Sequence, residues 1–187
     1  MSSTIQVDKI TDIGGNTMIE SNGSGTFTSN LPASGGITSA DTWRVTANFQ
    51  GNATPIATNW ERADTYSPGY IGTGMSQSSG IFTFPSTGIW DITFNHTFSS
   101  AGDNQYIEST IDATTDNSSY NKASKSWQGA TANAVYGMAS CKFLFDVTNI
   151  TTHKLRFSTT SQDADAYTQT STNTNLTYVT FIRLGNT

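Results

Sequence analysis

The sequence predicts an all-β protein built from antiparallel strands. Residues of high strand propensity are frequent: the 187-residue chain has 32 Thr and 14 Ile but only five Leu. From residue 41, apolar and polar side chains alternate with a period of two, and turns rich in Gly, Ser and Asn separate the alternating segments. About eight such segments, with no convincing helical stripe between them, predict an antiparallel sandwich or barrel.

The alternating segments can be followed in chain order. Seven of them cover residues 42–49, 81–84, 90–98, 106–112, 136–147, 155–159 and 176–184, and the polar residues 161–175 form a loop or a weak further strand. The last of the seven carries apolar residues on both faces, whereas a strand with one side in water normally has a polar face. We therefore expect its outer face to meet another subunit, although a central strand covered by a loop would show the same pattern.

The first 40 residues differ from the rest of the chain. Their apolar positions, among them Ile5, Val7, Ile10 and Ile13, are too sparse to build a core, and glycines interrupt them repeatedly. The sequence therefore predicts an extended anchoring arm and linker over residues 1–40 and a head domain over 41–187. We expect the four named residues to fill apolar pockets on a partner protein.

Charge and cysteine content exclude several classes of protein. Only 12% of residues are charged, the net charge is −5, and the nine basic residues are scattered, so no nucleic-acid footprint is present. No apolar run approaches the 18 residues of a membrane span, and the first residues do not have the pattern of a secretory signal. Because Cys141 is the single cysteine, neither an intrachain disulfide nor a multi-cysteine metal site is expected.

Candidate catalytic groups are few. The two histidines, His96 and His153, belong to no recognisable triad, and no G-x-S-x-G turn is present. We expect His96 to be a hydrogen-bonded core or interface residue, with a pH-sensitive subunit contact as the alternative. Asp163 and Asp165 have a spacing that a calcium loop would use, but solvated loop acids are the simpler interpretation. We therefore expect no enzyme activity, no cofactor and no metal site.

Several aromatic residues lie in polar or turn-rich stretches. They are Trp60, Tyr66, Tyr70, Tyr120, Trp127 and Tyr167. Flat rings beside amide side chains suit the faces and hydroxyls of sugars, whereas packing at the barrel ends or in subunit contacts is the simpler explanation. If the protein has a receptor surface, the sequence places it at Trp127, Tyr120 and Tyr167, with a host-surface glycan as the ligand.

One block of the head resembles a known family. Residues 80–94, GIFTFPSTGIWDITF, resemble the signature of the complement-type globular head, which is a tumour necrosis factor-like jelly roll. Residues 177–184 are similar to the closing strand of that family, which lines the axis of a trimer. The resemblance covers about residues 41–185 and implies a jelly-roll sandwich, a homotrimer, and ligand binding rather than catalysis. It places five residues in the core or the trimer interface: Phe82, Phe84, Trp90, Tyr178 and Phe181.

A second, shorter resemblance concerns the arm. Residues 5–13, followed by a Gly-rich polar run, resemble the N-terminal attachment segments of fibre and appendage proteins of marine tailed bacteriophages. This resemblance implies a structural protein of the virion surface, made in the host cytoplasm and bound to other virion proteins through its arm. A capsid decoration or knob and a short tail-fibre tip that attaches to the host both fit. The alternative is a free carbohydrate-binding, lectin-like module; a polysaccharide hydrolase fits least.

Overall fold

The chain forms two compact units, Met1–Gly36 and Ile37–Thr187. The computed structural model describes residues 7–24, 27–29, 36–66, 68–130, 135–163 and 165–187. Within these ranges every regular element is a β-strand, and all strand pairs are antiparallel, which confirms the predicted fold class. Ile5, one of the four predicted anchoring residues, lies outside the described residues.

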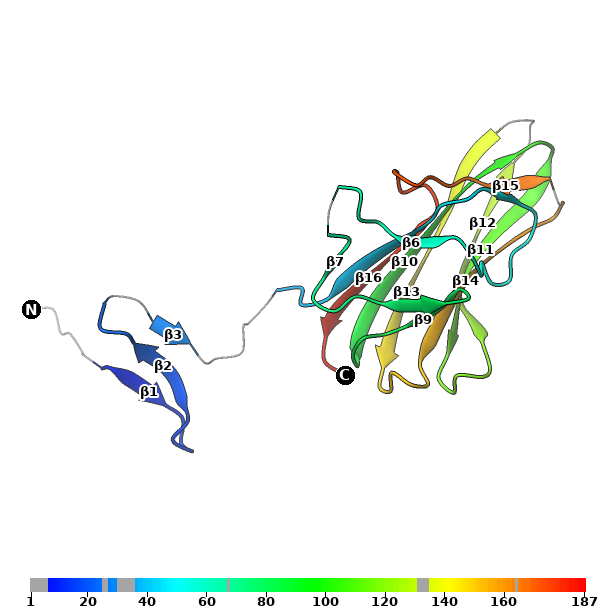
Figure 1. Ribbon diagram of the computed structural model, residues 1–187. Coiled ribbons are helices and arrows are strands. Elements are labelled where there is room, and N and C mark those ends of the chain that lie inside the picture. Colours follow the sequence, from blue (N-terminus) through cyan, green and yellow to red (C-terminus); the bar gives the residue numbers. More distant parts are fainter. Residues whose placement is uncertain (1–6, 25–26, 30–35, 67, 131–134, 164) are drawn as a thin grey trace, which may run out of the picture. The chain divides into compact units, whose positions relative to one another are not determined.

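The first unit contains a small three-stranded sheet. Its strands are β1 (Lys9–Thr11), β2 (Thr17–Ser21) and β3 (Phe27–Ser29), in the order β1-β2-β3 (Figure 1). The turn between β1 and β2 is closed by Asp12, whose carboxylate accepts hydrogen bonds from the backbone and side-chain nitrogens of Asn16 at 2.8 and 2.9 Å. Gly15 supplies the left-handed backbone that this turn needs, with φ of 81°. The segment therefore folds back on itself, where the sequence predicted a single extended arm, because the turn lets neighbouring strands pair their backbones.

The second unit packs two antiparallel sheets against each other (Figure 1). Sheet I contains β4 (Ala40–Val45), β5 (Phe49–Gln50), β6 (Trp60–Arg62), β7 (Tyr70–Ile71), β10 (Gly88–Ser100), β13 (Val135–Val147), β15 (Ala166–Thr168) and β16 (Tyr178–Gly185). Sheet II contains β8 (Ser76–Ser78), β9 (Ile81–Thr83), β11 (Asn104–Thr114), β12 (Asn121–Ala130) and β14 (Lys154–Ser161).

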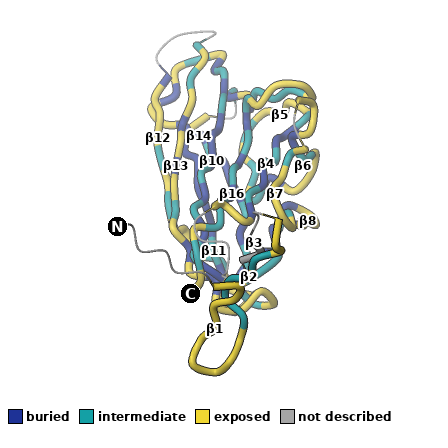
Figure 2. The backbone as a smooth tube through the Cα atoms, turned by 90° about the vertical axis from the view of Figure 1, so that its left-hand side faces the viewer, coloured by how far each residue is buried: buried dark blue, intermediate teal, exposed yellow. Residues whose placement is uncertain are grey.

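Strand β10 organises sheet I. It pairs with β13 along its whole length, and its other edge pairs with β16 and then β15. Sheet II has the order β12-β11-β14-β9-β8, so β12 lies at its edge. Figure 2 shows β12 and β13 running side by side, with exposed segments along both. The edges of the two sheets therefore meet along β12 and β13 on this side of the sandwich.

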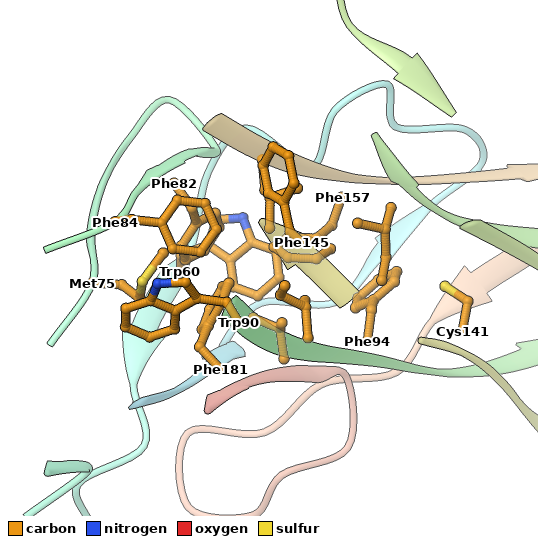
Figure 3. Packing of buried hydrophobic residues seen from close by; sticks show 14 of the residues in the cluster. Trp60, Met75, Phe82, Phe84, Trp90, Phe94, Cys141, Phe145, Phe157 and Phe181 are labelled. Atoms are coloured by element: carbon orange, nitrogen blue, oxygen red, sulfur yellow. The ribbon is translucent and has the colours of Figure 1, made fainter. Parts of the chain in front are cut away.

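The core between the sheets is rich in aromatic residues (Figure 3). The Phe82 ring of β9 lies 5.3 Å from Phe157 of β14, 5.4 Å from Phe181 of β16 and 5.1 Å from Trp60 of β6, measured between centroids. Phe82, Phe157 and Phe181 are each fully buried. Because burying one such side chain stabilises a fold by about 1.5–3 kcal/mol, this cluster is a main source of the cohesion between the two sheets.

Candidate functional site

The outer face of sheet I is arranged in rows by the strand register. Across β13, β10 and β16, the first row is Leu144, Asp91 and Ile182, the second is Lys142, Thr93 and Thr180, and the third is Ser140, Asn95 and Tyr178. Two further outward positions on β13 are Met138 and Tyr136, opposite Thr97 and Ser99. Side chains directly opposite each other point to the same face, so these rows form one continuous surface.

Large apolar side chains on this face are exposed. Tyr136 is 72% exposed, Met138 55% and Leu144 58%. The sequence analysis did not single out these three residues. A signal was available, because residues 136–147 carry apolar residues on both faces, as the last strand does.

Charge is scarce on the same face. Lys142 Nζ and Asp91 Oδ2 form an ion pair at 2.8 Å. The second carboxylate oxygen of Asp91 is buried and has no hydrogen-bond partner among the described residues. The part of the face formed by β13, β10 and β16 combines three large exposed apolar side chains, short polar residues and one ion pair, which is the composition of a protein interface. Towards the edge of the same face, Arg44 of β4 lies opposite Tyr178 and pairs with Glu61 of β6 at 2.8 Å.

The outer face of sheet II is built differently. Lys122 pairs with Glu108, and Arg156 Nε donates to Asp112 Oδ2 at 3.1 Å. Ser158 Oγ donates to the same Asp112 oxygen at 2.9 Å. Asp112 thus lies buried within β11 and is paired, and it belongs to the alternating segment 106–112 that the sequence predicted.

The three predicted receptor residues lie in different parts of the head. Trp127 belongs to β12 of sheet II, and Lys125 Nζ lies 4.3 Å from its ring centroid. Tyr120 precedes β12 and has the Arg156 guanidinium 4.5 Å from its ring centroid. Tyr167 belongs to β15 of sheet I, beside Ser99 of β10. The structure does not bring these three aromatic rings together into one surface.

The other predicted site residues separate into two groups. Phe82, Phe84, Trp90 and Phe181 lie in the core of the second unit, whereas Tyr178 is half-buried and faces outward in the third row of sheet I. In the first unit Val7, Ile10 and Ile13 are all exposed. Of the five residues predicted to lie in the core or the trimer interface, Tyr178 is the one that faces outward from sheet I.

His96 lies inside the sandwich and is fully buried. Its Nδ1 lies 2.9 Å from Ser109 Oγ of β11, and its Nε2 lies 3.0 Å from Thr168 Oγ1 of β15. It therefore links the two sheets through hydroxyl groups. Burial without a charged partner lowers the pKa of His96 to about 3, so the ring is neutral near pH 7. This placement in the core argues against a pH-sensitive subunit contact at His96.

Reactive chemistry is scarce elsewhere in the described residues. Burial raises the pKa of the Cys141 thiol to about 12, so its thiolate is not populated near neutral pH. Asp165 accepts a hydrogen bond from Asn104 Nδ2 at 2.7 Å, and Asn104 Oδ1 accepts one from the backbone of Asp163 at 2.9 Å. In the described part of the chain, no three His, Cys, Asp or Glu side chains group as metal ligands, and no helix is long and apolar enough to span a membrane.

Comparison with known proteins identifies the fold. No protein-family model matches the sequence, and no curated protein matches it. Among solved structures, Eiger TNF from S. frugiperda matches with a TM-score of 0.62 at 10% identity, covering 79% of this chain and 93% of that one. Murine APRIL at pH 5.0 matches with a TM-score of 0.59 at 13% identity, covering 78% of this chain and 98% of that one. The chain therefore has a tumour necrosis factor-like jelly-roll fold, as the sequence predicted.

Proposed function

We propose that this protein is a non-enzymatic structural protein whose jelly-roll head assembles as a homotrimer through the outer face of sheet I. The observation that carries the proposal is the exposure of Tyr136, Met138 and Leu144 on the part of this face formed by β13, β10 and β16, where one ion pair is found among the described residues. Tyrosine and methionine are enriched in protein interfaces, and charged residues are depleted at interface cores. The shared fold and the resemblance of residues 177–184 to a strand that lines a trimer axis both favour three copies over two.

The N-terminal unit is proposed to anchor the trimer to a particle. Val7, Ile10 and Ile13 are exposed on a unit too small to bury them, and a partner surface would remove them from water. A trimer carries three such units, so weak individual contacts combine through avidity. The resemblance of residues 5–13 to phage attachment segments supports the surface of a tailed-bacteriophage virion as the location, as a decoration or a short fibre tip.

Sedimentation and particle binding test the two parts separately. The full chain is expected to sediment with three times the 20.1 kDa mass of one copy. Deletion of residues 2–20 is expected to leave that mass unchanged and to abolish co-sedimentation with virions. A monomer at micromolar concentration contradicts the assembly, and normal incorporation of the shortened chain into particles contradicts the anchor.

A further inference from the structure

The second unit contains a pocket at the β4–β6 edge of sheet I. Its volume is about 350 Å³, and its lining includes Arg44 of β4, Thr65 and Tyr66 after β6, and Asn173 and Asn175 before β16. Three segments far apart in the sequence thus converge on one hollow. A volume of this size lies at the lower end of the range for small-molecule sites.

Arg44 lies buried in this pocket with hydrogen-bonding capacity unused. Its side chain is 3% exposed, and its Nη2 donates to Glu61 Oε1 at 2.8 Å and to Thr65 Oγ1 at 2.7 Å. Its Nε is buried and has no hydrogen-bond partner among the described residues.

The rim of the pocket combines an open aromatic ring with amides. Tyr66 is 92% exposed, which leaves its ring available as a flat apolar surface. Asn173 and Asn175 are also exposed, and each amide offers both donors and an acceptor. A flat ring next to several amides and hydroxyls matches the alternation of C–H faces and hydroxyls on a sugar ring.

The charges near the pocket determine whether a neutral or an acidic sugar is favoured. Arg44 is the charged residue of the pocket lining, and its positive charge is compensated by Glu61 at 2.8 Å and Asp64 at 3.9 Å. A compensated cation gives a carboxylate or phosphate on the ligand little net attraction, whereas neutral hydroxyls can both donate to the amide oxygens and accept from the amide nitrogens of Asn173 and Asn175.

We propose that this pocket binds a neutral pyranose unit of a surface glycan. The sugar's apolar face stacks on Tyr66, and its hydroxyls bond to Asn173, Asn175 and the Thr65 edge.

The pocket opens on the outer face of sheet I, because Arg44 lies opposite Tyr178 of β16 in the strand register. This binding role goes beyond the assembly proposed above and requires that the trimer contact use the β13 and β10 side of that face and leave the β4–β6 edge uncovered. It also differs from the aromatic positions chosen from sequence, because Trp127 and Tyr120 each already carry a cation on the ring.

Saturation-transfer NMR on the full chain tests the site. The probes are the methyl pyranosides of glucose, galactose, mannose and N-acetylglucosamine, with methyl glucuronoside and N-acetylneuraminic acid as acidic comparisons. At least one neutral glycoside is expected to bind, and Tyr66→Ala to weaken it about tenfold or more. Tyr66→Phe retains the ring and is expected to retain binding, and Trp127→Ala serves as an exposed aromatic control elsewhere on the head.

Three results would overturn the proposal. They are no transfer to any neutral glycoside, binding confined to the acidic sugars, and binding lost with Trp127→Ala but retained with Tyr66→Ala. Because Tyr66 is exposed, its substitution is not expected to unfold the protein, and thermal melting of each variant checks this. Sedimentation of the same samples reports the oligomeric state independently, so failure of sugar binding and failure of trimer assembly give different results.

Discussion

On the outer face of sheet II, the charged side chains form ion pairs. On the outer face of sheet I, large apolar side chains are exposed. On sheet II, Lys122 and Arg156 reach over the strands to Glu108 and Asp112, and both carboxylates are buried beneath those long side chains. On sheet I, the three outward rows hold Asp91, Thr93 and Asn95 on β10 and Ile182, Thr180 and Tyr178 on β16, and Lys142 of β13 is the basic side chain in these rows. Both faces belong to the same sandwich and share one core.

The difference shows how one domain can have one face suited to water and another suited to contact with a protein. Long basic side chains cover a sheet with their aliphatic stems and hold their charges at the water boundary, so sheet II needs no partner. The three rows on β13, β10 and β16 have one such basic side chain, Lys142, and the exposed apolar side chains beside it are typical of a surface that another protein occupies. The predictions below test this contrast between the two faces, starting with the largest effect.

A charge placed on sheet I is expected to dissociate the trimer. Met138→Glu buries a carboxylate in the proposed interface, and we expect the association to weaken by about a thousandfold, or about 4 kcal/mol. Sedimentation measures this change. The matched control is Trp127→Glu on sheet II, since Met138 and Trp127 are both 55% exposed. If both variants, or neither of them, dissociate the protein, the contrast between the faces is wrong.

Breaking a charge pair on sheet II is expected to destabilise the fold and to leave assembly intact. Arg156→Ala leaves the Asp112 carboxylate, 4% exposed, with Ser158 as its remaining hydrogen-bond donor. We expect the free energy of unfolding to fall by about 3 kcal/mol, measured by urea denaturation. Lys142→Ala is the comparison on sheet I, where Lys142 is 62% exposed and a loss below about 1 kcal/mol is expected. An equal decrease in the free energy of unfolding in the two variants would contradict the distinction between the buried ion pair of sheet II and the exposed ion pair of sheet I.

Acid is expected to weaken the core that both faces share. Because burial lowers the pKa of His96 from 6.5 to about 3, the unfolded chain binds a proton at His96 before the folded chain does. The contribution of neutral His96 to the free energy of unfolding is fully present above pH 6.5 and is lost as the pH falls toward 3. We expect the free energy of unfolding to be about 2 kcal/mol lower at pH 5 than at pH 7.5 from this residue.

Two measurements isolate the contribution of His96. His96→Gln retains hydrogen-bonding groups but cannot take up a proton in this range, so its pH profile is expected to be flatter than that of the wild type. In the wild type, the imidazole NMR signals of His96 are expected to remain those of the neutral ring at pH 5. A protonated His96 in the folded protein at pH 5 would contradict the buried placement, whatever the stability of the variant.

The sequence anticipated the inner faces of the sandwich better than its outer ones. Trp90, Ile92, Phe94, His96 and Phe98 alternate in the printed sequence, and all five are buried on one face of β10. The turn at Asp12 was missed because nothing in a run of glycines and sparse isoleucines says which segments will pair. The pocket was missed because Arg44, Tyr66 and Asn175 are remote from one another in the chain and no local pattern relates them.

Period-two alternation and composition alone determined that this chain is all-β, because the pleat sends successive side chains to opposite faces whatever the topology is. Tertiary structure decided which outward faces were covered. Asp112 and Thr93 both lie on outward-facing strand positions, but Asp112 is buried beneath Arg156, whereas Thr93 lies on the open face of sheet I. That outcome depends on which strands become neighbours and in what register, and these long-range pairings are set by the packing of the whole core.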